Sequence, residues 1–171
     1  MSKKSLVLFY SWSGNTRRIA RIIAEKTGAD LRELQPERDY PQNYDEVLSQ
    51  AKEEIERKQY PALRPIDMDW NAYEVVYLGT PNWWSTTAPP VTAFLREMMP
   101  TDKTIIPFCT HGGGGEGKIA HVVRSHCIGC DVFPLLSIQE DGGAQAETLV
   151  EQWLKRIKRY ERLTIRCQPQ K

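Results

Sequence analysis

The stretch LVLFYSWSGNT, residues 6–16, carries the strongest structural and functional signal in this chain. Residues 6–10 are an apolar run typical of a buried strand, and from Thr16 to Ala24 apolar side chains recur at helical spacing. Residues 11–16 are therefore expected to connect a strand to a helix. The first N–H groups of a helix have no partner and carry a partial positive charge, so this turn is suited to binding an anion.

The residue types in the turn support an anion site. Ser11, Ser13 and Thr16 offer three hydroxyl donors. Gly14 permits a positive φ and lets the backbone approach a ligand closely. Asn15 can bond its own turn through its side chain. The same residue types are common in ordinary capped turns, so composition alone leaves a purely structural turn open.

Strand and helix patterns alternate along the rest of the chain. Alternation of this kind predicts an α/β fold with a parallel sheet and helices on both faces. Ligands of such sheets bind beyond the carboxyl ends of the strands. Pro107 falls within the fourth strand and cannot donate a hydrogen bond, so we expect an irregular start or a bulge there. The expected strands are residues 6–10, 29–34, 75–78, 104–109 and 131–138, and the expected helices follow from Thr16, Tyr44, Val91, Ile119 and Leu149.

Two later segments also leave the carboxyl ends of expected strands. Residues 79–84 read GTPNWW, and residues 107–115 read PFCTHGGGG. An indole presents a flat face on which an aromatic ring can stack. We expect one of Trp83 and Trp84 to contact such a ring and the other to support the loop, without distinguishing which; packing of both into the core is the alternative.

Together the three segments resemble those of the short flavodoxins. The Ser-x-Ser-Gly-Asn-Thr turn is similar to the loop that binds the terminal phosphate of FMN, and the other two segments are similar to the loops around the flavin ring. The resemblance covers about residues 5–158 and implies one domain over residues 1–171, with a doubly wound, five-stranded parallel sheet in the order 2-1-3-4-5. It implies FMN as the cofactor, bound by Ser11, Trp12, Ser13, Gly14, Asn15, Thr16, Thr80, Pro81, Asn82, Trp83, Trp84, Thr110, His111, Gly112 and Gly113.

Four basic or titratable residues near these loops have two interpretations each. His111 stands where the family usually has Ser, and its imidazole could tune the flavin or a nearby substrate, or simply bond the loop backbone. Arg17, Arg18 and Arg21 follow the turn and either assist a phosphate dianion or form a solvated helix face.

The resemblance implies a redox protein that transfers electrons through bound FMN to a partner protein. The alternative is an FMN-dependent oxidoreductase that uses NAD(P)H and a small acceptor of the quinone type. A flavodoxin-like binding scaffold without flavin is the third possibility, disfavoured by the intact hydroxyls of the turn. Residues 112–118 also fit nucleotide motifs in part, but Ile119 stands where a P-loop has the Mg²⁺-binding Ser or Thr. The lack of a convincing second nucleotide motif favours the carrier.

The cysteines indicate neither a disulfide scaffold nor a metal site. Cys127 and Cys130 form a Cys-x-x-Cys pattern, but Cys127 lies on the apolar stripe of an expected helix and Cys130 follows Gly129, a residue type that commonly ends helices. A thioredoxin-type pair would lie at a helix N-terminus, where the thiol pKa is lowered. We therefore interpret these cysteines as structural and expect no metal.

Charge is distributed unevenly along the chain. The net charge is +1, but residues 151–171 carry seven Lys or Arg and two Glu. We interpret residues 159–171 as a basic, solvated tail and expect neither nucleic acid nor a membrane as partner. No apolar run approaches the roughly 18 residues of a membrane span, and no signal peptide is evident, so we expect a cytoplasmic protein. The oligomeric state is left open.

Overall fold

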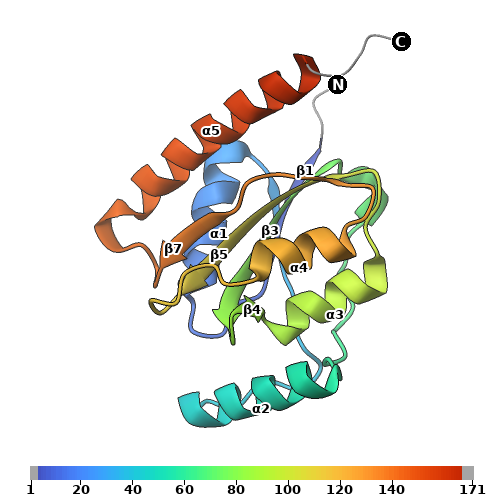
Figure 1. Ribbon diagram of the computed structural model, residues 1–171, viewed down its shortest axis with the longest axis vertical. Coiled ribbons are helices and arrows are strands. Elements are labelled where there is room, and N and C mark those ends of the chain that lie inside the picture. The colour runs from blue at the N-terminus through green and yellow to red at the C-terminus, as the bar shows by residue number, and fades with distance from the viewer. Residues whose placement is uncertain (1–3, 167–171) are drawn as a thin grey trace.

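The computed structural model describes residues 4–166 and shows strands alternating with helices (Figure 1). The strands form one sheet in the order β2-β1-β3-β5-β6, with β7 continuing beside β5. All of these strands are parallel, which confirms the predicted order 2-1-3-4-5. The elements are β1 (Ser5–Phe9), α1 (Asn15–Thr27), β2 (Asp30–Glu33), α2 (Tyr44–Arg57), η1 (Trp70–Ala72), β3 (Val75–Trp83), β4 (Thr86–Thr87), α3 (Pro89–Met98), β5 (Thr104–His111), α4 (Ile119–His126), β6 (Asp131–Val132), β7 (Leu136–Gln139), η2 (Gly143–Gln145) and α5 (Ala146–Arg166).

Two apolar layers hold the helices against the sheet. Successive side chains of a strand point to opposite faces, so Val7 and Phe9 of β1 join one layer and Leu6 and Leu8 join the other. The first layer packs against α1 and α5, and the second packs against α2, α3 and α4. Helices therefore cover both faces of the sheet, as the alternating pattern predicts (Figure 1).

The third strand is longer than predicted. β3 does not end at Leu78 but continues to Trp83, and there it turns back into the short antiparallel strand β4. The two central residues of this hairpin, Trp84 and Ser85, have φ angles of 55° and 62°. Positive φ at both positions is the geometry of a type I′ turn, which matches the twist of a hairpin. The segment expected as a loop is thus mostly a β-hairpin.

The strand expected at residues 131–138 is divided into β6 and β7. This division explains how β5 tolerates Pro107, which has no N–H to donate. β5 runs without interruption, so the predicted bulge is wrong. The Phe133 N–H bonds to the carbonyl of Ile105, and β7 begins to pair with β5 at Phe108. Alternate residues of a parallel strand face the same neighbour, so Pro107 faces the interval between β6 and β7, where no ladder partner requires its missing N–H.

Helix α2 lies on the long excursion between β2 and β3, at the carboxyl end of the sheet (Figure 1). Asn43 caps the helix, since its side chain accepts hydrogen bonds from the N–H groups of Asp45 and Glu46 at 3.0 and 3.1 Å. A bond of 2.5 Å from the Tyr40 hydroxyl to the Glu54 carboxylate holds the helix to the excursion.

Helix α5 continues to Arg166, so the first residues of the expected tail, 159–166, are helical. The ring of Tyr160, on this part of α5, packs on Phe133 with centroids 4.9 Å apart. Only residues 167–171 of the expected tail lie outside the described residues. Within residues 4–166 no helix is both long and apolar enough to cross a membrane.

Candidate functional site

The three segments singled out in the sequence meet at the carboxyl end of the sheet. They line a cavity of about 380 Å³ together with two residues of α2, Tyr44 and Leu48. Ser11 lines a neighbouring cavity of about 320 Å³ beside Trp12 and Ser13. Gly14, Thr16, Thr80 and Gly113 do not line the main cavity. The expected residues that do are Trp12, Ser13, Asn15, Pro81, Asn82, Trp83, Trp84, Thr110, His111 and Gly112.

The first segment folds as a helix N-terminus whose first N–H groups have no partner within the helix. Gly14 is the N-cap residue with a φ of 98°, which glycine adopts easily. The first backbone bond of α1 runs from the Arg18 N–H to the Gly14 carbonyl at 3.0 Å, so the N–H groups of residues 15–17 have no partner within the helix. The Ser11 oxygen is buried and accepts the Gly14 N–H at 3.1 Å. Ser11 therefore braces the turn.

The hydroxyls of this turn have different environments. Ser13 is exposed, whereas Thr16 is only 1% exposed. The Thr16 Oγ1 lies 2.8 Å from the Oγ1 of Thr110, which is also buried, at the end of β5. This bond joins the first segment to the third. Of the three predicted hydroxyl donors, only Ser13 is freely presented to a ligand.

The two adjacent tryptophans have distinct roles in the structure. Trp83 is 7% exposed and lies edge-on between Tyr10 and Tyr40, with ring centroids 5.6 and 5.4 Å apart. Trp84 is 49% exposed, and its Nε1–H donates to the Leu48 carbonyl at 2.9 Å. Trp83 thus supports the hairpin from within, and Trp84 connects its tip to α2.

Aromatic side chains form the outer wall of the cavity. The Trp12 Nε1–H donates to the Pro41 carbonyl at 3.0 Å, and the Trp12 ring lies 6.1 Å from that of Tyr44. Tyr44 is 62% exposed, so it does not lie on the buried face of α2. No local sequence pattern places Tyr44 and Leu48 at the site, because only the course of the excursion brings α2 there.

The glycine-rich segment is fastened to the hairpin. The Asn82 Nδ2 donates to the Gly115 carbonyl, and the Lys118 N–H donates to the Ser85 carbonyl, both at 2.6 Å. A Cβ on Gly117 would lie 2.6 Å from the Ser85 oxygen, so this contact requires glycine. The Asn82 Oδ1 is buried in the cavity wall and has no hydrogen-bond partner among the described residues.

His111 ends β5 at the cavity and is half-buried. Its Nδ1 accepts the Gly113 N–H at 3.0 Å. Because this nitrogen acts as an acceptor, a neutral imidazole here carries its proton on Nε2. Protonation of the ring would remove the acceptor and release the backbone of the glycine-rich segment.

The arginines after the turn make specific contacts. Arg17 binds the Glu33 carboxylate through Nε and Nη2 at 2.9 and 2.6 Å, and this hydrogen bonding raises the pKa of Arg17. Its Nη1 lies 3.7 Å from the position a Cβ on Gly14 would take, beside the turn. Arg18 instead donates to the carbonyls of Asp141 and Gly143, which fixes α1 to the segment before α5.

The three described cysteines, Cys109, Cys127 and Cys130, do not line the cavity. Burial raises the pKa of the Cys127 thiol to about 12 and that of Cys109 to about 11, so both are poor nucleophiles at neutral pH. Within the described residues no three His, Cys, Asp or Glu side chains are grouped as metal ligands.

Comparison with known proteins places this chain among flavoproteins. Residues 4–157 match the family model for flavodoxin. An uncharacterized protein of Archaeoglobus fulgidus is 28% identical over 123 residues, which are 71% of this chain and 75% of that protein. A solved structure from Bacteroides uniformis, assigned to the flavoproteins, is 28% identical with a TM-score of 0.77. The match covers 91% of this chain and 99% of that structure's chain. A flavoprotein of Lactobacillus acidophilus, solved in complex with FMN, is 24% identical with a TM-score of 0.71. The match covers 90% of this chain and 99% of that protein's chain.

Proposed function

This chain belongs to the flavodoxin family, and from that premise we propose that it binds FMN and transfers electrons through the bound flavin. The observation that carries the proposal is the cavity at the carboxyl end of the sheet, where an anion-binding turn and aromatic side chains face the same space. FMN unites a phosphate with a flat aromatic ring, and the Lactobacillus acidophilus relative was solved with this ligand. The flavin would supply the redox chemistry, and the protein would bind and orient it.

The turn after β1 fits a terminal phosphate. The unpartnered N–H groups of residues 15–17 and the exposed Ser13 hydroxyl would donate to the phosphate oxygens. Arg17 lies beside the turn, and its bidentate contact with Glu33 limits the movement of its guanidinium and offsets its charge. Because Thr16 and Ser11 are buried and bonded, we assign them to the framework of the turn.

The aromatic wall fits the flavin ring. Trp12, Tyr44 and Trp84 present ring surfaces at the cavity, and Trp84 is the exposed member of the tryptophan pair. The unpartnered Asn82 Oδ1 is an acceptor available to an N–H of the ring once small movements expose it. His111 lies at the same cavity with its Nε2 directed away from its Gly113 contact.

A second candidate function is an FMN-dependent oxidoreductase that uses NAD(P)H and a quinone-type acceptor. The exposure of Tyr44 and Trp84 favours it, because exposed aromatic surface beside a flavin would accept a second flat molecule. In the carrier, the same surface would contact a redox partner protein. A flavodoxin-like scaffold without flavin is disfavoured, because the turn retains hydrogen-bond donors that a phosphate would use.

Two measurements test the proposal and separate its two forms. The protein purified without added cofactor should show a flavin absorption spectrum, and heat should release FMN and not FAD. Steady-state oxidation of NADH and NADPH is then measured with a quinone as the acceptor. The rate should be negligible if the protein is a carrier, and should saturate with rising NADH or NADPH concentration if it is an enzyme. A chain that neither retains FMN nor binds it when it is added would refute both forms.

The tuning role of His111 has its own test. A positive charge on the His111 imidazole would favour the negatively charged reduced flavin. We expect the midpoint potential to change slope with pH in the wild-type protein and to lose that change in His111→Ser. Superimposable curves for the two proteins would return His111 to a structural role as the acceptor for Gly113.

A further inference from the structure

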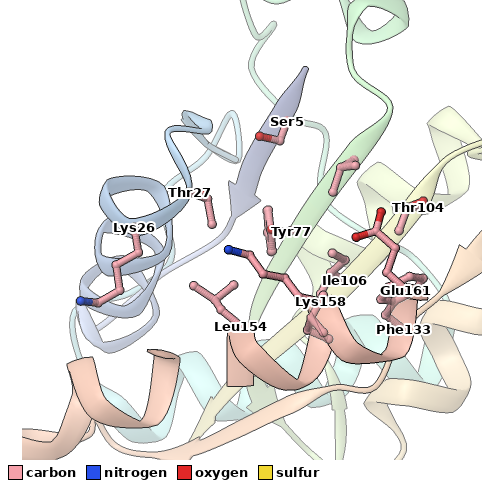
Figure 2. A pocket seen from close by; sticks show the side chains of 12 residues that line it. Ser5, Lys26, Thr27, Tyr77, Thr104, Ile106, Phe133, Leu154, Lys158 and Glu161 are labelled. Atoms are coloured by element: carbon pink, nitrogen blue, oxygen red, sulfur yellow. The ribbon is translucent and has the colours of Figure 1, made fainter. Parts of the chain in front are cut away.

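A second cavity lies at the opposite end of the sheet, where the parallel strands begin. Figure 2 shows it between the sheet and the C-terminal half of α5. Its volume is about 400 Å³, comparable to that of the cavity at the carboxyl end. Apolar side chains from β3, β5, α5 and the segment after β6 form its walls, namely Val75, Ile106, Phe133, Leu154 and Ile157. The apolar walls would take a hydrophobic ligand, and the size suits one at the small end of the usual range.

The polar groups around this cavity differ in how they are engaged. Lys26 is neutralised on one rim, because its Nζ lies 2.7 Å from the Glu151 carboxylate and 3.6 Å from that of Glu147. Lys158 extends from α5 across the cavity toward Tyr77 and Thr27 (Figure 2). Within the part of the chain that the structure describes, no carboxylate lies at ion-pair distance from Lys158.

Two further polar groups, Tyr77 and Glu161, lie at different sides of the cavity. Tyr77 lies at its base, and burial together with the nearby Glu161 raises the pKa of this phenol, so the hydroxyl remains a donor. Glu161 points toward Thr104, on the other side of the cavity from the end of the Lys158 side chain (Figure 2). Negative charge in a ligand is therefore attracted to the Lys158 side of the cavity.

We propose that this cavity is a second binding site, for an aliphatic carboxylate of medium chain length. The carboxylate would bind Lys158 and the Tyr77 hydroxyl, and the chain would lie along the apolar walls. Because the cavity is lined by the first residues of β1, β3 and β5, it is separate from the cavity at their carboxyl ends. The proposal does not depend on FMN binding.

Calorimetric titration of the purified protein, with any cofactor it retains, tests this site. Octanoate, nonanoate and decanoate are used below their micelle concentrations. Affinity should rise about fourfold for each added methylene, the increment expected for burial of one such group. Lys158→Gln should weaken decanoate binding at least tenfold, whereas Lys155→Gln, an exposed change on α5 that does not line the cavity, should leave it unchanged.

Methyl NMR locates the ligand. Decanoate should shift the methyl signals of Leu154, Ile106 and Val75 and leave those of Leu48, at the other cavity, in place. Decylamine that binds as tightly as decanoate, or an unaltered affinity in Lys158→Gln, would overturn the proposal. So would binding that appears only after residues 2 and 3 are removed, because the chain's own N-terminal residues would then be the occupant.

Discussion

At the scale of single residues, two hydroxyls of one turn are expected to do different work. Ser13 is exposed at the N-terminus of α1, while Thr16 is buried against Thr110. Ser13→Ala should lower FMN affinity by about tenfold or more, because a hydrogen bond to a charged group contributes about 1.5–3 kcal/mol. Riboflavin, which lacks the phosphate, should bind the variant and the wild-type protein equally. Fluorescence titration with both ligands measures the difference, and Ser125→Ala on α4 is the control.

Thr16→Val tests the other half of that contrast. The change leaves the buried Thr110 hydroxyl without its partner, so the free energy of unfolding should fall by about 1–3 kcal/mol. Adding Thr110→Val removes both hydroxyls and should recover part of the loss. Urea unfolding of the three apoproteins provides the values. A large loss of FMN affinity with unchanged stability would show instead that Thr16 binds the phosphate directly.

The tryptophan pair gives a second residue-scale prediction. Because Trp83 packs between Tyr10 and Tyr40, Trp83→Ala should destabilise the fold by about 3–5 kcal/mol. Trp84→Phe removes the hydrogen bond to Leu48 and should lower stability by only about 0.5–1.5 kcal/mol. It should also remove much of the tryptophan quenching that FMN causes, since the exposed indole faces the cavity. Stopped-flow fluorescence and thermal unfolding separate the two effects. Quenching that is intact in Trp84→Phe would exclude contact between this indole and the flavin.

At the scale of elements, local patterns predicted most of the architecture. Helices α1, α3 and α4 follow from apolar spacing and from Pro89 and Pro90 at a helix start. The hairpin at β4 was missed because its turn, Trp84–Ser85, lacks the Asn-Gly or Gly residues that usually mark a type I′ turn. Tertiary contacts compensate for this unfavourable backbone, through Lys118 to the Ser85 carbonyl and Trp84 to α2.

The candidate site could be predicted only in part, because some of its residues form local motifs and others reach it through tertiary contacts. The residues of the turn and of the two strand ends form local motifs, so their grouping follows from the parallel order of the strands. Tyr44 and Leu48 reach the cavity only through the path of a long excursion. The separate environments of Ser13 and Thr16, or of Trp83 and Trp84, depend on distant partners that no spacing reveals.

Helix α2 provides a prediction at this scale. Asn43 satisfies two N–H groups at its start, and the helix supplies one wall of the cavity. Asn43→Ala should lower the free energy of unfolding by about 1 kcal/mol and weaken FMN binding, because the wall would be less ordered. Asn43→Asp, which keeps the capping oxygen, should restore both. Hydrogen exchange of the α2 amides measures the local effect, and equal protection in all three proteins would contradict the role of the cap.

At the scale of the whole molecule, buried acidic groups determine how stability depends on alkaline pH. Burial raises the pKa of Cys109 from 9.0 to about 11 and that of Cys127 from 9.0 to about 12. Burial also raises the pKa of the Tyr10 and Tyr40 phenols, and the bond to Glu54 adds to the effect at Tyr40. Above about pH 9 the unfolded chain therefore releases protons that the folded protein retains.

Stability should accordingly fall as the pH rises from about 9 toward 12, because the unfolded state binds fewer protons in that range. Each such group steepens the fall by up to about 1.4 kcal/mol per pH unit. In Cys127→Ala and in Tyr40→Phe the free energy of unfolding should decline less steeply with pH than in the wild-type protein. Each protein is compared with its own value at pH 7. Urea unfolding at intervals across this range measures the slope, and an unchanged slope in both variants would show that other groups cause it.

The central claim is that the carboxyl end of the sheet binds FMN through its phosphate. The most direct measurement is the titration of one apoprotein with FMN, riboflavin and FAD under identical conditions. We predict that FMN binds at least tenfold more tightly than riboflavin, because only FMN can bond the N–H groups at the start of α1, and that FAD binds weakly because the turn accepts a terminal monophosphate. Equal affinities for FMN and riboflavin would contradict the claim.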